Sequence, residues 1–128
     1  PIFIQKAIAG EDIPVYGDGE QMRSFGYVRD AVKCTIALMD NENSLGEVFN
    51  IGNETEISIN DLAQLVIKKC NSTSKIIYKS YEEAYGSGFE DMKRRKPNSD
   101  KLSKIIGMKP EFPIEKVIDE MIIYFKAN

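Results

Sequence analysis

Apolar residues recur every three or four positions in several parts of this 128-residue chain, which is the spacing of an amphipathic helix. The clearest case follows Pro113, a residue that suits the first turn of a helix. Its apolar positions predict a helix that packs on a core, and they are Ile114, Val117, Ile118, Met121, Ile122 and Phe125. Shorter patterns of the same kind predict helices at 1–9, 30–39, 59–70 and 99–106.

Several helix ends are marked by residues with known capping chemistry. Asp30 is a good N-cap, because its carboxylate can accept hydrogen bonds from free backbone amides. Ser58 and Asp61 stand three positions apart, as in a capping box with Asp in place of Glu. Gly10 and Gly107 are expected to end helices. The helix that starts at Asp30 is expected to turn one apolar face toward a core, formed by Ala31, Val32, Thr35, Ile36 and Met39.

Short apolar runs between turn-forming residues predict strands. We expect them at 13–16, 24–28, 48–52 and 75–79, with a further strand pairing at Ile57. The segment 80–97 is rich in Gly, Glu, Lys and Arg and is expected to be irregular. Short strands mixed with four or five helices predict a small domain of the α/β (mixed α+β) class.

Composition and charge narrow the classes of protein. A length of 128 residues fits one domain, and a hydrophobic fraction of 42% with 29% charged residues indicates a globular chain. The net charge of -3 argues against non-specific nucleic-acid binding, which needs a basic excess. The absence of histidine removes the commonest acid/base group at neutral pH and the commonest zinc ligand.

The cysteine content and the length of the apolar runs indicate the cellular compartment of the protein. Two cysteines, Cys34 and Cys70, make no disulfide framework, and both lie in helical apolar patterns as expected of small buried hydrophobes. No apolar run approaches the roughly 18 residues of a membrane span. We therefore expect a cytoplasmic protein without membrane or nucleic-acid partners. The apolar start Ile2-Phe3-Ile4, right after Pro1, suggests the carboxy-terminal part of a longer protein.

The segment 14–30 contains the strongest candidate for binding. Its glycine turn, Gly17-Asp18-Gly19, precedes a single cation, Arg23. Arginine binds phosphate through two parallel charge-assisted hydrogen bonds, and glycines let backbone amides approach a ligand. Gln21 would lie on the same side of an extended segment as Arg23. An ordinary surface arginine is the alternative interpretation.

The only dense basic run is Lys93-Arg94-Arg95-Lys96-Pro97. Such a run is usually a solvated face or a nucleic-acid patch. In an acidic chain it could instead clamp a diphosphate together with Arg23. Both interpretations stay open from the residues alone.

The remaining candidates each have a structural alternative. Asn50 either forms a turn at the end of the expected strand or donates to a ligand. Tyr81 and Tyr85 are expected to cover the core rather than line a pocket. The carboxylate pairs Glu82-Glu83 and Glu90-Asp91 are expected to be solvated, not to act in acid/base chemistry.

Motifs of cofactor binding and catalysis are missing from the chain. It contains no Gly-x-Gly-x-x-Gly, no Walker lysine and no Tyr-x-x-x-Lys. We therefore expect no catalytic, cofactor-binding or metal-binding residue within these 128 positions.

Taken in order, the motifs resemble the signature of the extended short-chain dehydrogenase/reductases that act on nucleotide sugars. The resemblance extends over essentially the whole chain, and the ordered set is specific although each motif alone is weak. The matching residues are Tyr16-Gly17-Asp18-Gly19-x-Gln21-x-Arg23-Ser24-Phe25-x-Tyr27-Val28-x-Asp30, Gly46-Glu47-Val48-Phe49-Asn50-Ile51-Gly52, Ile57-Ser58-Ile59-x-Asp61-Leu62-Ala63, Arg94-Arg95-x-Pro97 and Ile106-Gly107-x-x-Pro110.

In that family an amino-terminal Rossmann domain holds NAD and the catalytic Ser/Thr and Tyr-x-x-x-Lys, and the carboxy-terminal half binds the nucleoside diphosphate. The resemblance implies that residues 1–128 are such a nucleotide-sugar binding domain, separated here from its Rossmann domain. It implies that Arg23 and Arg95 hold the diphosphate, and that Gln21 and Asn50 orient phosphates or ribose. The segment Val15-Tyr16-Gly17 would lie against the base, and Asp30 would cap its helix rather than bind.

The implied full-length enzyme is a homodimer that oxidises a sugar hydroxyl with NAD, rearranges the keto intermediate and reduces it again. We rank a UDP-sugar 4-epimerase first, and a UDP-glucuronate decarboxylase or dTDP-glucose 4,6-dehydratase second. A non-catalytic nucleotide-sugar binding or assembly module is the alternative of another class. One departure from the pattern is Asn98, which stands where the family usually has Asp, so the ligand set around Arg95 is less defined.

Overall fold

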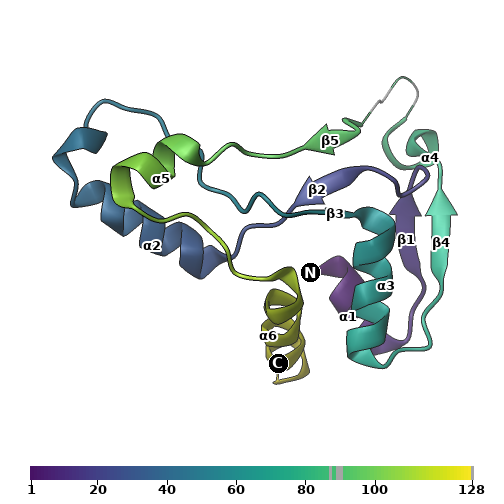
Figure 1. The fold of residues 1–128 in the computed structure, drawn as a ribbon. Helices are drawn as coiled ribbons and strands as arrows, with labels where there is room; N and C mark the ends of the chain where they lie inside the picture. Colours follow the sequence, from purple (N-terminus) through teal and green to yellow (C-terminus); the bar gives the residue numbers. More distant parts are fainter. Residues whose placement is uncertain (87, 89–90, 128) are drawn as a thin grey trace. The chain divides into compact units, whose positions relative to one another are not determined.

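The computed structural model describes residues 1–86, 88 and 91–127, except for the side chains of Ala84 and Tyr85, and its ribbon is shown in Figure 1. The chain divides into two compact units, each made of segments that are distant in sequence. Unit 1 comprises Pro1–Arg23, Ile57–Arg94 and Glu115–Asn128, and unit 2 comprises Ser24–Glu56 and Arg95–Ile114. The mixed α/β class expected from the sequence is confirmed.

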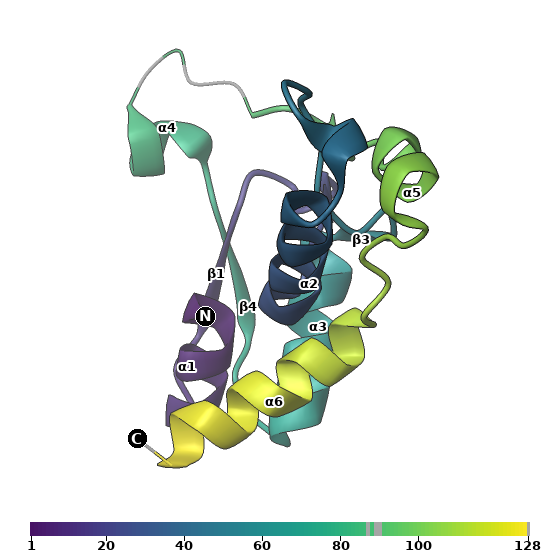
Figure 2. The same cartoon turned by 90° about the vertical axis from the view of Figure 1, so that its left-hand side faces the viewer.

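Unit 1 is built around two parallel strands. β1 (Ile13–Tyr16) pairs with β4 (Ile76–Lys79), and the register aligns Ile13 with Ile76 and Tyr16 with Lys79. Parallel strands need a crossover connection, and α3 (Ile59–Cys70) immediately precedes β4 and provides it. α1 (Ile2–Ala9) contacts both α3 and β1, so two helices cover the first strand (Figures 1 and 2).

The last helix, α6 (Ile114–Ala127), belongs almost entirely to unit 1 and follows the predicted amphipathic pattern. Ile118 and Ile122 are buried, and the remaining predicted apolar positions are partly buried. On its polar side Asp119 pairs with Lys69 of α3, with 2.7 Å between Nζ and Oδ1. The core of unit 1 therefore consists of β1 and the apolar faces of these helices.

Unit 2 contains α2 (Val28–Met39), the short 3-10 helix η1 (Glu42–Ser44) and α5 (Asp100–Ile106). α2 contacts both of the others. Tyr27, just before α2, stacks on Phe112 with 4.4 Å between the ring centroids. Ser99, just before α5, is fully buried, and its hydroxyl donates to the carbonyl of Gly52 over 3.0 Å.

Three further strands form a second sheet, in the order β3-β2-β5. They are β2 (Met22–Ser24), β3 (Glu56–Ser58) and β5 (Arg94–Arg95). Each lies at a point where the chain passes from one unit to the other. The expected strand pairing at Ile57 is confirmed, whereas the strand expected at 24–28 ends at Ser24 because α2 already begins at Val28.

Asp30 is not the N-cap that the sequence predicted. The N-cap is Tyr27, without a side-chain hydrogen bond, and Asp30 stands in the first turn of α2. Its carboxylate Oδ2 accepts from the backbone amides of Glu111 and Phe112 at 3.1 and 2.9 Å. The aspartate thus ties a second segment of unit 2 to α2, while its charge still suits the positive end of the helix.

The buried face of α2 also differs from the expected one. Val32, Ile36 and Met39 are 51%, 53% and 79% exposed, whereas Cys34 is 2% exposed. The stacked Tyr27 sets the rotation of the helix, so that the positions three or four residues apart from it face inward. Together with Val28, the outward residues form an exposed apolar stripe, which consists of Val28, Val32, Ile36 and Met39.

The strand expected at 48–52 is absent, since these residues have no regular secondary structure and pair with no strand among the described residues. Val48 is 83% exposed, and its carbonyl accepts a hydrogen bond from Lys101 instead of from a neighbouring strand. Strand propensity is realised only where a partner strand supplies hydrogen bonds. The sequence pattern alone could not reveal that this partner is lacking among the described residues.

The other predicted helices and strands are confirmed within one or two residues. α1 and α5 end at Gly10 and Gly107, both in the left-handed conformation. Ser58 caps α3 by accepting from the amide of Asp61 over 3.0 Å, and its own hydroxyl donates to the Asp61 carboxylate. None of the helices in the described part of the chain is long and apolar enough to span a bilayer.

Candidate functional site

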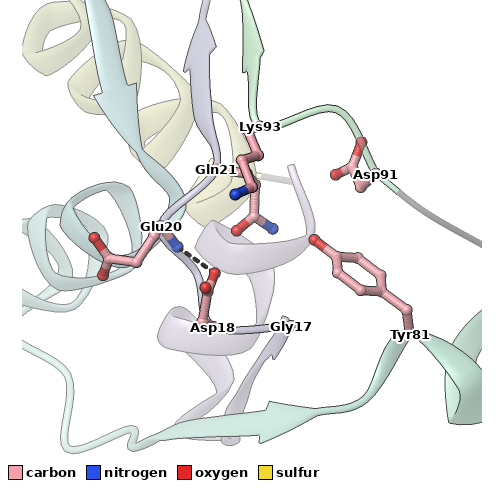
Figure 3. A pocket seen from close by; sticks show the side chains of 7 residues that line it. All are labelled: Gly17, Asp18, Glu20, Gln21, Tyr81, Asp91 and Lys93. Atoms are coloured by element: carbon pink, nitrogen blue, oxygen red, sulfur yellow. Dashed lines mark hydrogen bonds between the residues drawn. The ribbon is translucent and has the colours of Figure 1, made fainter.

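The glycine turn after β1 has the conformation that its residues suggest. Gly17 and Gly19 have φ angles of +71° and +74°, which residues with a Cβ rarely adopt. The amide of Gly17 donates to the carbonyl of Lys79, so the turn starts directly from the paired strands. The carboxylate of Asp18 accepts from the amide of Glu20 over 2.9 Å, which closes the turn (Figure 3).

A pocket of about 430 Å³ lies beside this turn in unit 1. Figure 3 shows the side chains that surround it. They come from the turn, from the start of α4 (Tyr81–Tyr85) and from the segment before β5: Gly17, Asp18, Glu20, Gln21, Tyr81, Asp91 and Lys93. Three acidic residues and one lysine are among the lining residues, so the wall is rich in hydrogen-bond acceptors.

Gln21 is the predicted ligand residue whose surroundings fit the prediction best. Its Nε2 donates to the carbonyl of Tyr16 over 3.0 Å, which fixes the orientation of the amide. Its Oε1 is buried and has no hydrogen-bond partner among the described residues. A buried acceptor without a donor costs on the order of 1–3 kcal/mol, so this oxygen is suited to a donor from a bound molecule.

Arg23 lies next to the pocket and is already engaged by protein groups. Its NH1 donates to the carbonyls of Met22 and Met92, both over 2.8 Å, and its NH2 pairs with Asp91 over 2.6 Å. The side chain is only 19% exposed. The guanidinium therefore fastens the segment before β5 to β2, a role that the sequence did not suggest. Asp91, expected to be solvated, is instead its ion-pair partner.

Tyr81 lines the pocket, although the sequence favoured a role in the core. A Cβ on Gly17 would come within 2.6 Å of the Tyr81 ring, so the glycine makes room for the aromatic side chain. Burial raises the pKa of Tyr81 above its ordinary value, and the nearby Asp91 and Asp18 raise it further. Tyr85, the second tyrosine considered, lies outside the described side chains.

The position of Tyr81 depends on a helix that the sequence analysis missed. α4 occupies part of the segment 80–97, which was expected to be irregular throughout. Ser80 and Glu83 form a complete capping box, with the Ser80 hydroxyl on the Glu83 amide and the Glu83 carboxylate on the Ser80 amide. The Ser-x-x-Glu spacing was the signal that could have revealed this helix.

The other predicted ligands are distributed over both units. Val15 is fully buried in β1, so its side chain faces the core, and Tyr16 is partly buried. Arg95 and Asn50 are exposed residues of unit 2. Asn50 donates weakly to the carbonyl of Asn98 over 3.4 Å. Their roles in binding stay predictions.

Asn98, which departs from the family pattern, keeps a structural role. Its Oδ1 accepts from the amide of Asp100 over 2.9 Å, and its carbonyl faces Asn50. An aspartate would form the same hydrogen bond with its carboxylate, so the change to asparagine preserves the local turn that leads into α5.

Comparisons with known proteins agree with the motifs. Residues 1–52 match the model of the NAD dependent epimerase/dehydratase family. The chain is 44% identical over 126 residues to a UDP-N-acetyl-alpha-D-glucosaminuronate decarboxylase of Bacillus cytotoxicus, which covers 98% of this chain and 39% of the relative. It is 36% identical to UDP-glucuronic acid decarboxylase 1 of Xenopus tropicalis, with 98% of this chain and 28% of the relative covered. The chain thus spans well under half the length of these curated relatives.

A solved structure has the same fold. The UDP-glucose 4-epimerase of Thermotoga maritima, determined with UDP-glucose, superposes with a TM-score of 0.86 at 26% sequence identity. The match covers 98% of this chain and 38% of the epimerase. In its ordered motifs, its sequence relatives and its fold, the chain is similar to the NAD dependent epimerase/dehydratase family, whose model matches residues 1–52.

Proposed function

We propose that this chain is the substrate-binding part of a longer NAD-dependent enzyme that acts on a UDP-sugar. The main support is the 44% identity to a UDP-sugar decarboxylase across nearly the whole chain. The pocket adds a physical argument, because its acceptor-rich wall and the free Gln21 Oε1 suit the hydroxyl groups of a ribose or sugar. The diphosphate would bind toward Arg23 and Lys93, with Arg95 as the further cation.

NAD itself would be held by residues outside this chain. Its pyrophosphate needs backbone amides of a glycine-rich loop or cationic side chains. The chain contains no Gly-x-Gly-x-x-Gly motif that would supply such a loop. Bound to the full enzyme, NAD would supply the hydride chemistry, and the present residues would bind and orient the sugar nucleotide.

Binding can be tested by calorimetric titration of UDP into the natural protein that contains this chain. Arg23→Ala should cost about 2–4 kcal/mol of affinity if the guanidinium meets a desolvated diphosphate. Arg95→Ala should lower the affinity for UDP more than the affinity for uridine, because only UDP carries phosphates. Arg29→Ala removes one positive charge from an exposed position and is the matched control. Unchanged affinity in both test variants would refute the proposed diphosphate site.

Among the possible reactions, we propose decarboxylation of a UDP-hexuronic acid. The sequence motifs alone ranked 4-epimerisation first, but the two sequence relatives named above are decarboxylases at 44% and 36% identity. The epimerase structure matches at lower identity, 26%, so 4-epimerisation is the second candidate.

The reaction types differ in their products. The natural protein, supplied with NAD, would be incubated with UDP-glucuronate, UDP-N-acetylglucosaminuronate and UDP-glucose in parallel. Release of CO₂ from either uronate supports decarboxylation, whereas a C4 epimer without CO₂ supports the second candidate. Binding of UDP without conversion of any of these substrates would favour the non-catalytic binding module.

We further propose that the missing part of this enzyme covers the apolar stripe of α2. Four large apolar side chains project from one helix face, and the segment 48–52 of the same unit has strand-like residues that pair with no strand among the described residues. Soluble proteins rarely leave such contiguous apolar surface uncovered. More than half of the length of the relatives lies outside this chain, so an occupant of sufficient size is expected in the same polypeptide.

A further inference from the structure

Asn60, the second residue of α3, has more hydrogen bonds to the pocket-forming turn than any ligand candidate. Its Nδ2 donates to the carbonyl of Asp18 over 2.9 Å and to Oε1 of Glu20 over 2.8 Å. Its backbone amide donates to the carbonyl of Gly19 over 3.0 Å. One asparagine thus contacts three consecutive residues of the turn.

These contacts use the free donors at the start of a helix. The first amides of α3 have no acceptor within the helix. Ile59 and Asn60 direct theirs to the carbonyls of Gln21 and Gly19, at 3.3 and 3.0 Å. The turn is therefore seated on the amino-terminal end of α3, and the helix determines where it lies.

The side chain of Asn60 is itself held in place. The hydroxyl of Tyr78, on β4, donates to its Oδ1 over 3.1 Å. A Cβ on Gly19 would come within 2.0 Å of the same oxygen, so the turn and the asparagine are packed as closely as glycine allows. The orientation of the Asn60 amide is thus set from two sides.

We propose that Asn60 is a positioning residue of the substrate pocket. It does not line the pocket, but Asp18 and Glu20, which it contacts, and Gln21, which directly follows them, do. The Asn60 amide fixes the direction of the Glu20 carboxylate. The amide of Ile59, its neighbour at the start of α3, donates to the carbonyl of Gln21, whose Oε1 has no partner among the described residues. This inference rests on the proposed function, because the pocket matters only if it binds substrate.

The sharpest test is Asn60→Asp in the natural protein. The substitution keeps the shape of the side chain, and an acidic residue is tolerated in the first turn of a helix. It replaces both donated hydrogen bonds by contacts between oxygens, next to Glu20. We expect the affinity for UDP to fall about tenfold, which corresponds to a loss of one or two hydrogen bonds. Asn43→Asp, at an exposed position of unit 2, is the matched control and should leave the affinity unchanged.

A rescue separates positioning from general destabilisation. In the double variant Asn60→Asp/Glu20→Gln, the new amide at position 20 can donate to the carboxylate at position 60, which restores the hydrogen bond with reversed polarity. The double variant should bind UDP more tightly than Asn60→Asp alone. A folded Asn60→Asp protein that binds UDP like the unaltered protein would overturn the inference.

Failure of the proposed function would look different. If the unaltered protein does not bind UDP at millimolar concentration, the substrate assignment fails. The role of Asn60 in holding the turn can still be tested without a ligand, from the NMR amide shifts of Gly17 and Gly19. These amides should shift in Asn60→Asp and not in Asn43→Asp. If Asn60→Asp does not fold, Tyr78→Phe removes only the hydrogen bond to Oδ1 and should produce a smaller shift of the same amides; unshifted amides would count against the inference.

Discussion

Arg23 shows how a residue can be identified from sequence while its contacts are not. Its place after a glycine turn marked it as an anion-binding group, and it does lie beside a pocket. The structure adds that Asp91 and two backbone carbonyls already occupy its donors. A diphosphate would therefore have to compete with the Asp91 carboxylate for the same guanidinium.

This competition leads to a prediction for Asp91→Asn. Without the carboxylate, Arg23 and Lys93 are less neutralised, so the affinity for UDP should rise about threefold to tenfold, because charge-assisted contacts dominate phosphate binding. Calorimetry at constant ionic strength measures the change. Asp119→Asn is the control, because it also removes an exposed carboxylate from an ion pair, the one with Lys69. A loss of affinity would show that Asp91 contributes to binding instead.

The same substitution should change the titration of Tyr81. Burial and the charge of Asp91 raise the Tyr81 pKa, because both disfavour the negatively charged tyrosinate. Asp91→Asn should therefore lower this pKa toward its ordinary value without fully restoring it, since burial remains. The ¹³Cζ shift of Tyr81 followed against pH measures the effect. An unchanged titration curve would mean that Asp91 does not act on the phenol.

A third prediction concerns Gly19. Gly19→Ala should destabilise the protein by about 2–4 kcal/mol, because the positive φ is strained for alanine and the new Cβ collides with Asn60. Gly19→Ala/Asn60→Ala removes the collision but not the strain, so the two losses should be less than additive. Urea unfolding of the four proteins in this cycle measures the coupling. Full additivity would contradict the close packing of the two residues.

Among the elements, local sequence signals succeeded where they act within the element itself. Glycines at the ends of α1 and α5 and the Ser58 cap of α3 were all recognised, because capping depends on neighbouring residues only. The rotation of α2 was predicted wrongly, because Tyr27 and Phe112 set it through a contact between segments far apart in sequence. Likewise, the segment 48–52 has strand-forming residues but pairs with no strand in the described part of the chain.

A hydrogen bond at the start of α5 predicts how the stability of the folded protein depends on pH in the acidic range. Oε1 of Glu54 accepts from the amide of Ser99 over 2.8 Å, at the start of α5. This hydrogen bond, aided by Lys109, lowers the pKa of Glu54. A lowered pKa stabilises the folded state above the ordinary value of about 4.3, and this contribution is lost as the pH falls through the folded-state pKa.

Glu54→Gln should therefore lower the melting temperature at pH 7, and the difference from the unaltered protein should shrink at an acidic pH below the folded-state pKa of Glu54, where the unaltered carboxyl is also neutral. Thermal unfolding followed by circular dichroism at both pH values measures this. Glu42→Gln, an exposed glutamate of unit 2, is the control. A difference that is equal at both pH values would show that charge on Glu54 is not the cause.

For the whole molecule, the exposed stripe of α2 is the feature that a larger assembly would explain. Val32→Asp/Ile36→Asp should change the stability of the isolated chain by less than about 1 kcal/mol, since both side chains are already about half exposed. In the longer protein proposed above, the double variant should lose about 3 kcal/mol, because both side chains would be buried there. Thr35→Asp, on an exposed position of the same helix, is the control. Equal small losses in both forms would contradict the proposed cover.

The sequence by itself indicated the family, most of the helices and most helix ends, because ordered motifs, periodicity and capping are properties of neighbouring residues. It also singled out Gln21 and Arg23 as ligand candidates, and the structure places Gln21 at a pocket and Arg23 next to it. Only the tertiary structure decided which side chains face one another. It placed Tyr81 and Asp91 at the pocket, gave Arg23 an internal partner and assigned Asn60 to the turn. These facts depend on contacts between residues about 20 to 70 positions apart, and the chemistry of neighbouring residues does not specify such contacts.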